Sequence, residues 1–248
     1  MLYSPQTIHS TSLSAILKAG QLKAKHLLYS LSEASIAQKN PATPCFKEIN
    51  PRATRILNLN QSQEELLKAM HPKGRYNIKV AKKNQITVKK SQDLKTFYQL
   101  WQQTSQRDEF AIHSLKYLEK VFKNLQNATL YLAYHEKKPI AGLIALDGKN
   151  TRFYLYGASD HKFRKLMAPY ALQWEAITDA KNNNLQTYDF LGVQNPLDKS
   201  NKLQGVSEFK RKFGGDIIYF QKGQIKIYNW PIFILMKIRK LLKNLKFF

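Results

Sequence analysis

Cysteine is almost absent from this chain of 248 residues, which contains only Cys45. A single cysteine excludes an internal disulfide framework and a metal site built from several cysteines. It also fits a reducing compartment, so we expect a cytoplasmic protein. His71 and His113 lack a paired ligand spacing, and we therefore expect no metal site.

Long apolar runs are missing as well. The longest, from Trp230 to Met236, is far too short to span a bilayer. Residues 1–20 lack a basic start followed by an unbroken apolar run, so we expect no secretory signal. No Ser-His-Asp or Cys-His arrangement for nucleophilic catalysis stands out.

Acidic residues are scarce, with 17 Asp and Glu against 40 Lys and Arg, and the formal net charge is +23. A chain this basic repels itself unless it meets polyanions. Two partners suit the charge, namely the phosphate backbone of a nucleic acid and an anionic membrane surface. The alternative is that the excess lysine only solvates the protein. Hydrophobic residues nevertheless form 43% of the chain, enough for the core of one large domain or two small ones.

The N-terminal part, residues 1–46, is rich in Ser, Ala, Thr and Lys. It predicts an atypical segment, helical or partly disordered, with helices near 13–18 and 22–31. A turn at 40–44 ends this segment. It does not read as a complete domain.

A strand and two helices are predicted next. Residues 55–59 read as a strand, and Ser62 with Glu65 three residues later predicts a capping box that begins a helix. Pro72 breaks this helix near its end. A second helix then covers about 73–83 and has a dense basic face.

The remaining elements follow from the period of the apolar residues. Helical spacing predicts helices, and strict alternation predicts strands. In chain order we expect a strand at 85–90, helices through 94–101 and 115–125, a meander of strands at 128–134, 139–146 and 151–157, a helix at 167–183, a strand at 187–192, a helix at 206–212, and closing strands at 216–220 and 224–228. This order is that of an N-acetyltransferase-like (GNAT) domain, so the predicted fold class is mixed α/β.

Five segments together resemble the Fem family of peptidoglycan aminoacyltransferases, whose members include lipid II amino-acid transferases and methicillin-resistance proteins. The segments are EELLKAMHPKGRYNIKVAKK (64–83), LW…T…RDEF…H (100–113), YLYGASD with LMAPYALQWEAI (154–160, 166–177), YDFLGV (188–193) and GVSEFKRKFGG (205–215). They occur in family order across residues 50–220. One segment alone would be a weak signal, but five in order are specific.

The resemblance implies two acetyltransferase-like domains, of which the first is truncated here. We therefore expect an atypical segment at 1–46, the remnant of a first domain at 47–90, a complete domain at 91–229, and a basic amphipathic helix at 230–248. The family's precursor cleft lies largely between the two domains. A fragment, a degenerate copy and a compact variant that works with a partner remain open.

The resemblance also implies the chemistry. An amine would attack the ester of an aminoacyl-tRNA, and the amino acid would pass to the stem peptide of a lipid-linked or nucleotide-linked peptidoglycan precursor. With aminoacyl-tRNA as the donor substrate, no cofactor is expected. Lys210 would stabilise the oxyanion, and Phe209 would pack near the terminal adenosine of the tRNA. The implied substrate-binding residues are Arg107, Tyr156, Tyr154, Arg75, Lys73 and Arg164.

Each of these assignments has a simpler alternative. Phe209 can belong to the core while Lys210 is solvated. Arg107 suits bidentate phosphate binding, but it can equally pair with Asp108 or Glu109. The basic helix at 73–83 can contact tRNA or lipid phosphates, or be an ordinary solvated face. No general base can be named, because the strand-end carboxylates of Asp160 and Asp189 read as structural.

The C-terminal tail is a separate signal. Its apolar stripe is Ile234, Ile238, Leu241, Leu242 and Leu245, and lysines and an arginine cover the rest. Such a helix can lie in a membrane interface, which predicts peripheral membrane contact through 232–248 at the inner face of the plasma membrane. It can also be a terminal helix that docks on the core.

Two other functions compete with aminoacyl transfer. A CoA-dependent N-acyltransferase would bind pyrophosphate through a glycine-rich loop before the long helix. That place reads HKFRKLMAPY (161–170) and contains no glycine, which argues against CoA. The second alternative is a catalytically inactive module that binds RNA or membranes through its charge.

Overall fold

Two units make up the chain, one from residues 1–22 and 50–220 and the other from 23–49 and 221–248. The computed structural model describes residues 43–44, 51–195, 203–220, 224–225, 230–231, 233–235 and 237–238. The predicted helices near 13–18 and 22–31, Cys45 and the tail beyond residue 238 lie outside the described residues.

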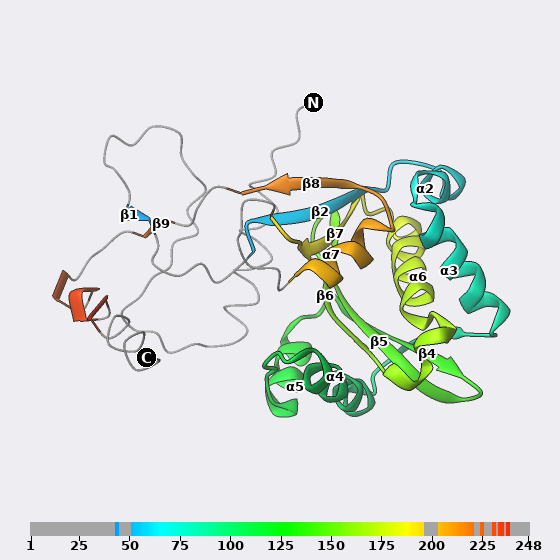
Figure 1. Ribbon diagram of the computed structural model, residues 1–248, viewed down its shortest axis with the longest axis horizontal. Helices are drawn as coiled ribbons and strands as arrows, with labels where there is room; N and C mark the ends of the chain where they lie inside the picture. The colour runs from blue at the N-terminus through cyan, green and yellow to red at the C-terminus, as the bar shows by residue number, and fades with distance from the viewer. Residues whose placement is uncertain are drawn as a thin grey trace. The chain divides into compact units, whose positions relative to one another are not determined.

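A mixed seven-stranded sheet organises the larger unit (Figure 1). Its strands are β2 (Ala53–Asn58), β3 (Thr87–Ser91), β4 (Ala128–His135), β5 (Lys138–Asp147), β6 (Thr151–Ser159), β7 (Thr187–Gly192) and β8 (Asp216–Tyr219). Their order in the sheet is β3-β4-β5-β6-β7-β2-β8. Every neighbouring pair is antiparallel except β6 and β7, which run parallel. The predicted mixed α/β class and the antiparallel meander are confirmed.

Helices cover both faces of this sheet. They are α2 (Gln63–Ala69), α3 (Pro72–Lys83), α4 (Leu94–Asp108), α5 (Leu115–Asn124), the 3-10 helix η1 (His161–Leu166), α6 (Ala168–Asn182) and α7 (Gln204–Arg211). The core on one face joins α2, α6 and α7 to the sheet, and a second core joins α4 and α5 to the opposite face. In Figure 1, α4 and α5 lie below the sheet, whereas α6, α2 and α3 lie beside one another on its other side.

The local signals in the sequence are confirmed where they are strongest. Ser62 caps α2 by accepting the backbone N–H of Glu65 at 3.1 Å, and Glu65 accepts the N–H of Ser62 at 2.7 Å. This is the predicted capping box. Strand β7 has the predicted bounds, and α6 differs from its predicted range by one residue at each end.

The strands around residues 47–90 and the last two strands pair differently from the sequence interpretation. Strand β2 lies between β7 and β8, and β3 pairs with β4, so the described strands of 47–90 belong to the same sheet as those of 91–220. The predicted closing strands do not pair with each other. β8 pairs with β2, whereas β9 (Gln224–Ile225) pairs with β1 (Thr43–Pro44) in the second unit. Long-range pairing of this kind leaves no trace in the period of a single strand.

A buried arginine fixes α6 to the sheet. Arg152 of β6 is 1% exposed, donates to both carboxylate oxygens of Asp147 at 2.6 and 2.7 Å, and donates to Asp179 of α6 at 2.7 Å. The same guanidinium reaches the hydroxyl of Tyr131 at 2.8 Å. A buried charge is tolerated only when it is paired and hydrogen-bonded, and here all the partners come from β4, β5 and α6. The network therefore holds α6 in place behind the site described below.

The described part of the second unit is short. Besides the pairing of β1 with β9, it contains a helical turn in which the rings of Trp230 and Phe233 meet edge to face at 5.8 Å. Trp230, Ile234, Leu235 and Ile238 are exposed there. No helix in the described ranges has the length and apolar character needed to cross a bilayer.

Candidate active site

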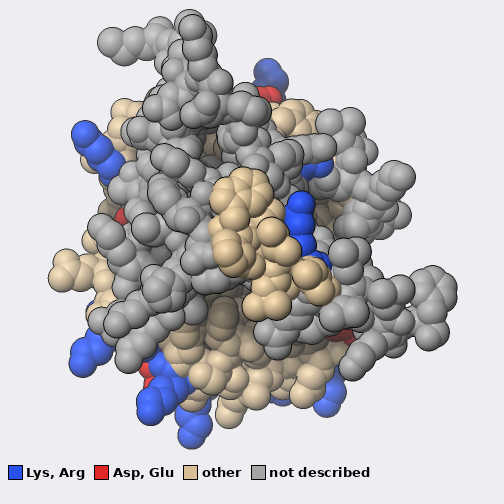
Figure 2. Space-filling view, turned by 90° about the vertical axis from the view of Figure 1, so that its left-hand side faces the viewer, with Lys and Arg blue, Asp and Glu red and all other residues tan. Residues whose placement is uncertain are grey.

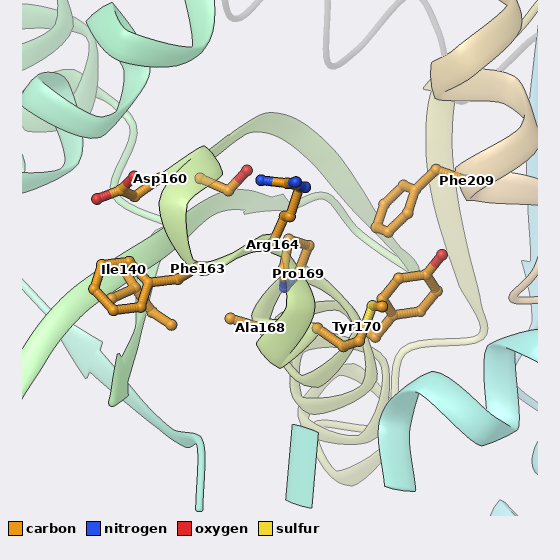
Figure 3. Close-up of a pocket in the computed structure, with 10 residues that line it drawn as sticks. Ile140, Asp160, Phe163, Arg164, Ala168, Pro169, Tyr170 and Phe209 are labelled. Atoms are coloured by element: carbon orange, nitrogen blue, oxygen red, sulfur yellow. The ribbon is translucent and has the colours of Figure 1, made fainter. Parts of the chain in front are cut away.

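A pocket of about 120 Å³ lies at the N-terminal end of α6. It is lined by the end of β6, by η1, by the first turn of α6 and by Phe209 of α7. In Figure 3 the rings of Phe209 and Tyr170 face one another at one end of the pocket, Phe163 and Ile140 lie at the other, and Arg164 lies between them. This volume is close to that of a cavity of ~150 Å³ that binds benzene. The pocket can therefore take one ring or one small side chain.

The backbone before α6 explains how the pocket forms. Asp160 ends β6 and accepts the N–H of Lys162 at 2.9 Å, which begins η1. Met167 then adopts a left-handed conformation with φ of 58°, which ends η1 and turns the chain into α6. Pro169 follows in the first turn, where its missing N–H costs nothing. Tyr170 is thereby placed on the pocket wall.

Aromatic packing fixes α7 against this wall. Phe209 meets Tyr170 edge to face at 5.1 Å and Phe213 at 5.2 Å, and Phe213 stacks on Phe190 of β7. Lys212 donates to the Tyr170 hydroxyl at 3.1 Å. Phe209 is partly buried, so its ring is both part of the core and part of the pocket lining.

Lys210 is buried, with 6% of its surface exposed, and it does not line the pocket. Its ammonium donates to the carbonyl oxygens of Leu191 at 3.2 Å and Gly192 at 2.7 Å. Consecutive carbonyls of an extended strand point to opposite sides, but Leu191 has a φ of 56°, which lets both reach one ammonium. Burial lowers the pKa of Lys210 to about 8, although nearby Asp189 acts in the opposite direction. The alternative of a solvated Lys210 is therefore wrong.

The ammonium of Lys210 lies where β6 and β7 separate. The two parallel strands pair over only three residues, 151–153 with 187–189, and then diverge. Tyr154 is the first residue of β6 beyond this pairing, and Lys210 lies over its ring at 5.7 Å from the centroid. Burial raises the pKa of Tyr154 to about 12, while the Gln173 side chain acts against this rise. Lys210 and Tyr154, predicted from separate segments, thus meet at one place.

Tyr156 lies on the opposite face of the sheet from Tyr154. Residues two apart in a strand normally share a face, but β6 contains a bulge because Ala145 pairs with Tyr154 and Ile144 pairs with Tyr156. Tyr154 consequently packs towards α6 and Tyr156 packs on Trp101 of α4, with ring centroids 4.7 Å apart. The sequence analysis gave both tyrosines a substrate-binding role, but the bulge places their side chains on opposite faces of the sheet.

Arg107 ends α4 on the same face as Tyr156. Its guanidinium forms two hydrogen bonds of 2.7 Å with Asp108, which is the simpler alternative weighed for this residue. A third, long contact of 3.5 Å reaches the carbonyl oxygen of Ser159, which lines the pocket. Arg107 therefore borders the pocket from the α4 side while its charge is already partly compensated.

The two predicted cations of α3 have different surroundings. Arg75 turns back to α2 and donates to the carbonyl oxygens of Leu67, Lys68 and Met70 at the end of that helix. Lys73 is exposed in the first turn of α3. Neither lines the pocket, whereas Arg164, an exposed residue of η1, does.

The two strand-end carboxylates have local partners. Asp189 is fully buried and accepts hydrogen bonds from the Thr54 hydroxyl and from the N–H of Leu191. Asp160 begins η1 as described above. Among the described residues, no cluster of three or more His, Cys, Asp or Glu could hold a metal ion.

A pyrophosphate would find few free donors before α6. The N–H of Met167 is donated to Arg164 and that of Tyr170 to Met167, and Pro169 has no N–H. Cofactors of the CoA type bind through such backbone N–H groups. The geometry agrees with the absence of glycine from 161–170 in disfavouring CoA.

Sequence reasoning missed Tyr170 and Ser159 as pocket residues. Tyr170 was noted only as an apolar position of the long helix, although Pro169 before it marks the first turn and hence the end of the helix that faces the sheet edge. For Ser159 no local signal was available. It contributes through its place at the end of β6.

Comparison with known proteins gives a consistent result. The model of the FemAB family matches residues 7–138 and 131–236. The lipid II:glycine glycyltransferase of Staphylococcus epidermidis (strain ATCC 35984) is 23% identical, and the match covers 77% of this chain and 62% of that protein. The corresponding enzyme of Staphylococcus aureus is also 23% identical, with 67% and 56% covered. The chain thus spans less than two thirds of the length of these relatives.

Solved structures share the fold. FemX superposes with a TM-score of 0.67 at 21% identity, covering 78% of this chain and 66% of that chain. The structure of L-PGS from Bacillus licheniformis gives a TM-score of 0.52 at 13% identity, with 75% and 64% covered. At these identities the likeness concerns the fold alone, and it agrees with the predicted acetyltransferase-like mixed α/β architecture.

Proposed function

Because the chain belongs to the FemAB family, we propose that it transfers an amino acid from a charged tRNA to an amino group on the stem peptide of a lipid-linked peptidoglycan precursor. The printed names of the relatives, lipid II:glycine glycyltransferases, support this reaction class. The excess of lysine and arginine supports the binding of two polyanionic substrates, the tRNA and the lipid-linked precursor. Figure 2 shows one face on which lysine and arginine side chains project at several points and acidic ones are fewer.

The observation that carries the proposal is the pocket lined by Phe209, on the helix whose next residue is the buried Lys210. A pocket for one ring would hold one of the two fused rings of the terminal adenine of the tRNA, and Phe209 supplies an aromatic surface for the base. The ester that joins the amino acid to the ribose would then lie towards the divergence of β6 and β7. Arg164 would meet the phosphate next to this ribose.

Lys210 has the right donor count for the proposed chemistry. An ammonium has three N–H donors, and two of them go to Leu191 and Gly192. The third is available for the oxygen that becomes negative when the amine attacks the ester carbonyl. The C–N bond forms, the carbon–oxygen bond to the ribose breaks, and the ribose hydroxyl leaves with a proton. Because two carbonyls already orient the ammonium, it would stabilise the negative oxygen that forms only in the transition state.

The acceptor would approach from the side of α4. Arg107 is held by Asp108 in a fixed orientation and lies against Ser159 at the pocket border, so its remaining donors could meet a precursor phosphate. Tyr156, packed on Trp101, would flank that phosphate. Tyr154 would act from the other face of the sheet by contacting Lys210.

Contact with the membrane is part of the proposal, because the acceptor carries a lipid. Trp230, Ile234, Leu235 and Ile238 are exposed, and the sequence beyond residue 238 adds further lysines. An exposed apolar stripe flanked by cations suits the interface of an anionic bilayer. We place the protein at the cytoplasmic face of the plasma membrane on this basis.

A transfer assay with purified full chain tests the proposed function. Charged tRNA with a labelled amino acid is mixed with a lipid-linked or a nucleotide-linked precursor, and label in the precursor is measured. We expect transfer, with Lys210→Ala slower by about 10²- to 10³-fold, the loss typical of one oxyanion donor. Binding of both substrates without transfer by the wild-type chain would instead favour an inactive binding module.

The assay needs two controls. Lys210→Ala removes the group that donates to the carbonyl oxygens of Leu191 and Gly192, so the fold of this variant is checked by urea unfolding. Lys210→Gln serves as a variant that keeps an N–H donor. Transfer from an acyl-CoA in place of charged tRNA would contradict the proposed donor.

A further inference from the structure

The exposed face of α3 is a second feature that the pocket does not account for. It combines one large aromatic side chain, Tyr76, which is 63% exposed, with four exposed lysines, namely Lys73, Lys79, Lys82 and Lys83. Lys73 precedes Tyr76 by three residues, and Lys79 and Lys83 follow it by three and seven. By the helical repeat these side chains share one face.

The charges of this face lack local compensation. Helix α3 contains no acidic residue, and none of its four lysines forms an ion pair with any residue that the structure describes. Acidic residues three or four positions from a cation stabilise a solvated helix, as in α7, where Glu208 pairs with Arg211. Unpaired cations around an exposed aromatic ring are suited to bind a polyanion that also carries planar rings.

Helix α3 starts beside α7, which contributes Phe209 to the pocket, and it makes this contact through the side opposite Tyr76. Helices α3 and α7 touch so closely that a Cβ on Gly74 would lie 2.3 Å from the carbonyl oxygen of Lys212. The same carbonyl accepts the N–H of His71 at 3.2 Å. The ammonium of Lys212 reaches the hydroxyl of Tyr170, which lines the pocket. Tyr76 lies in the half of α3 nearer to this contact, and Lys79 and Lys83 lie farther along.

We infer that this face of α3 binds the acceptor arm of the donor RNA, with Tyr76 stacking on an unpaired nucleotide near the 3′ end and the lysines contacting phosphates of the adjoining duplex. The inference rests on the proposed use of charged tRNA. Unpaired bases stack on exposed aromatic rings, and lysines contact phosphates without reading sequence. Lys73 to Lys83 extends about 15 Å along the helix, the axial length of roughly four phosphates of one duplex strand.

A matched pair of double variants tests the inference. Lys79→Ala/Lys83→Ala removes two charges four residues apart on α3. Lys116→Ala/Lys120→Ala removes two exposed charges at the same spacing on α5, which covers the other face of the sheet. The probe is an uncharged RNA hairpin with an unpaired CCA 3′ end, and binding to the full chain is measured over a range of salt concentrations.

The α3 double variant should bind the hairpin roughly tenfold more weakly. Its plot of log binding constant against log salt should be shallower by about 1.8, which corresponds to two lost phosphate contacts. The α5 double variant should bind like the wild type. Equal losses for the two double variants, or none for the α3 variant, would overturn the inference.

Tyr76→Ala provides an independent measurement. It should lose roughly five- to more than a hundredfold in affinity for the hairpin with the unpaired end, the range for one base stacked on an aromatic ring. It should lose little for the same duplex with a blunt end. An equal loss for both probes would contradict stacking by Tyr76.

Two further outcomes separate this inference from its alternatives. If the α3 double variant loses binding to vesicles of anionic phosphatidylglycerol but keeps binding to the RNA, the face belongs to the membrane and the inference is wrong. Hairpin binding involves no transfer. If the wild type transfers the amino acid but the α3 double variant binds the hairpin as the wild type does, only the inference is refuted. If the wild type binds the hairpin through α3 but transfers nothing, only the proposed function is refuted.

Discussion

Lys210 of α7 donates a hydrogen bond of 2.7 Å to the carbonyl oxygen of Gly192, the last residue of β7. The contact joins a helix that contributes Phe209 to the pocket with the strand that diverges from β6. It requires the left-handed backbone of Leu191, a conformation that costs of order 1–3 kcal/mol in a residue other than glycine. Backbone strain of this size clusters at active sites and ligand-binding sites.

The first prediction concerns the pH dependence of transfer. The attacking amine must be neutral, so the rate should rise with pH at first. Burial lowers the pKa of Lys210 to about 8, so the ammonium that stabilises the oxyanion is lost as the pH rises through this value. We expect a falling limb near pH 8 in the rate at saturating substrates. Lys210→Arg, which keeps its charge, should lack this limb, and Phe209→Ala should retain it.

The second prediction concerns recognition of the tRNA end. Phe209→Ala removes the ring that packs on Tyr170 at one end of the pocket. We expect the KM for charged tRNA to rise by roughly five- to a hundredfold, as for one lost base stack, with a smaller change in kcat. Val206→Ala, an exposed position on the same helix, is the control and should change neither parameter. A change in kcat alone would argue against stacking by Phe209.

The third prediction concerns the contact of α3 with α7. Alanine is favoured over glycine in a helix, yet a Cβ on Gly74 would lie 2.3 Å from the backbone oxygen of Lys212. Gly74→Ala should therefore destabilise the protein by about 1–3 kcal/mol. Gly205→Ala, in α7, meets no atom within 4 Å and should stabilise the protein by up to about 1 kcal/mol. The free energy of unfolding in urea gives both values. A change of the same sign in the two variants would refute the close packing at Gly74.

The fourth prediction concerns acid stability. Burial raises the pKa of Asp179, but hydrogen bonds from Lys90, Tyr131 and Arg152 outweigh it and lower the pKa to about 2. An unfolded aspartate titrates near ~3.9, so the stabilisation is complete above that pH and is lost as the pH falls towards 2. Wild-type unfolding free energy should drop as the pH falls from about 5 to about 2.

Two variants make this measurement specific to Asp179. Asp179→Asn should be less stable at pH 5 and should lose less on acidification than the wild type. Glu175→Gln removes an exposed carboxylate from the same helix and should follow the wild-type curve. A parallel decline of Asp179→Asn and the wild type would show that other carboxylates dominate.

The sequence predicted those elements whose signals are local. The capping box at Ser62 and Glu65 and the break at Pro72 depend on contacts a few residues apart, and the observed helices begin and end as expected. The strand meander followed from alternation alone. The pairing of β2 between β7 and β8 could not be predicted in this way, because it joins segments more than 120 residues apart.

The sequence analysis named single residues at and near the pocket but not their arrangement. Phe209 and Arg164 line the pocket, and Lys210 meets Tyr154, although nothing in the spacing of these residues required it. The bulge in β6 that turns Tyr156 to the other face is followed by Gly157, where a Cβ would clash with the Tyr154 hydroxyl, but a glycine in a strand does not by itself tell which way its neighbours turn. Arg75 capping α2 is different, because an arginine six residues after the last residue of a helix is a local signal.

The position of β3 at the edge of the sheet bears on how copies of the protein behave in concentrated solution. An edge strand has unpaired backbone groups that could template association with a second molecule. Lys89 and Lys90 are exposed on this edge. Lys90 is paired with Asp179, but in two copies aligned antiparallel through β3 the Lys89 ammonium groups of both would lie along the shared edge, so like-charge repulsion would oppose sheet extension and favour a dispersed protein.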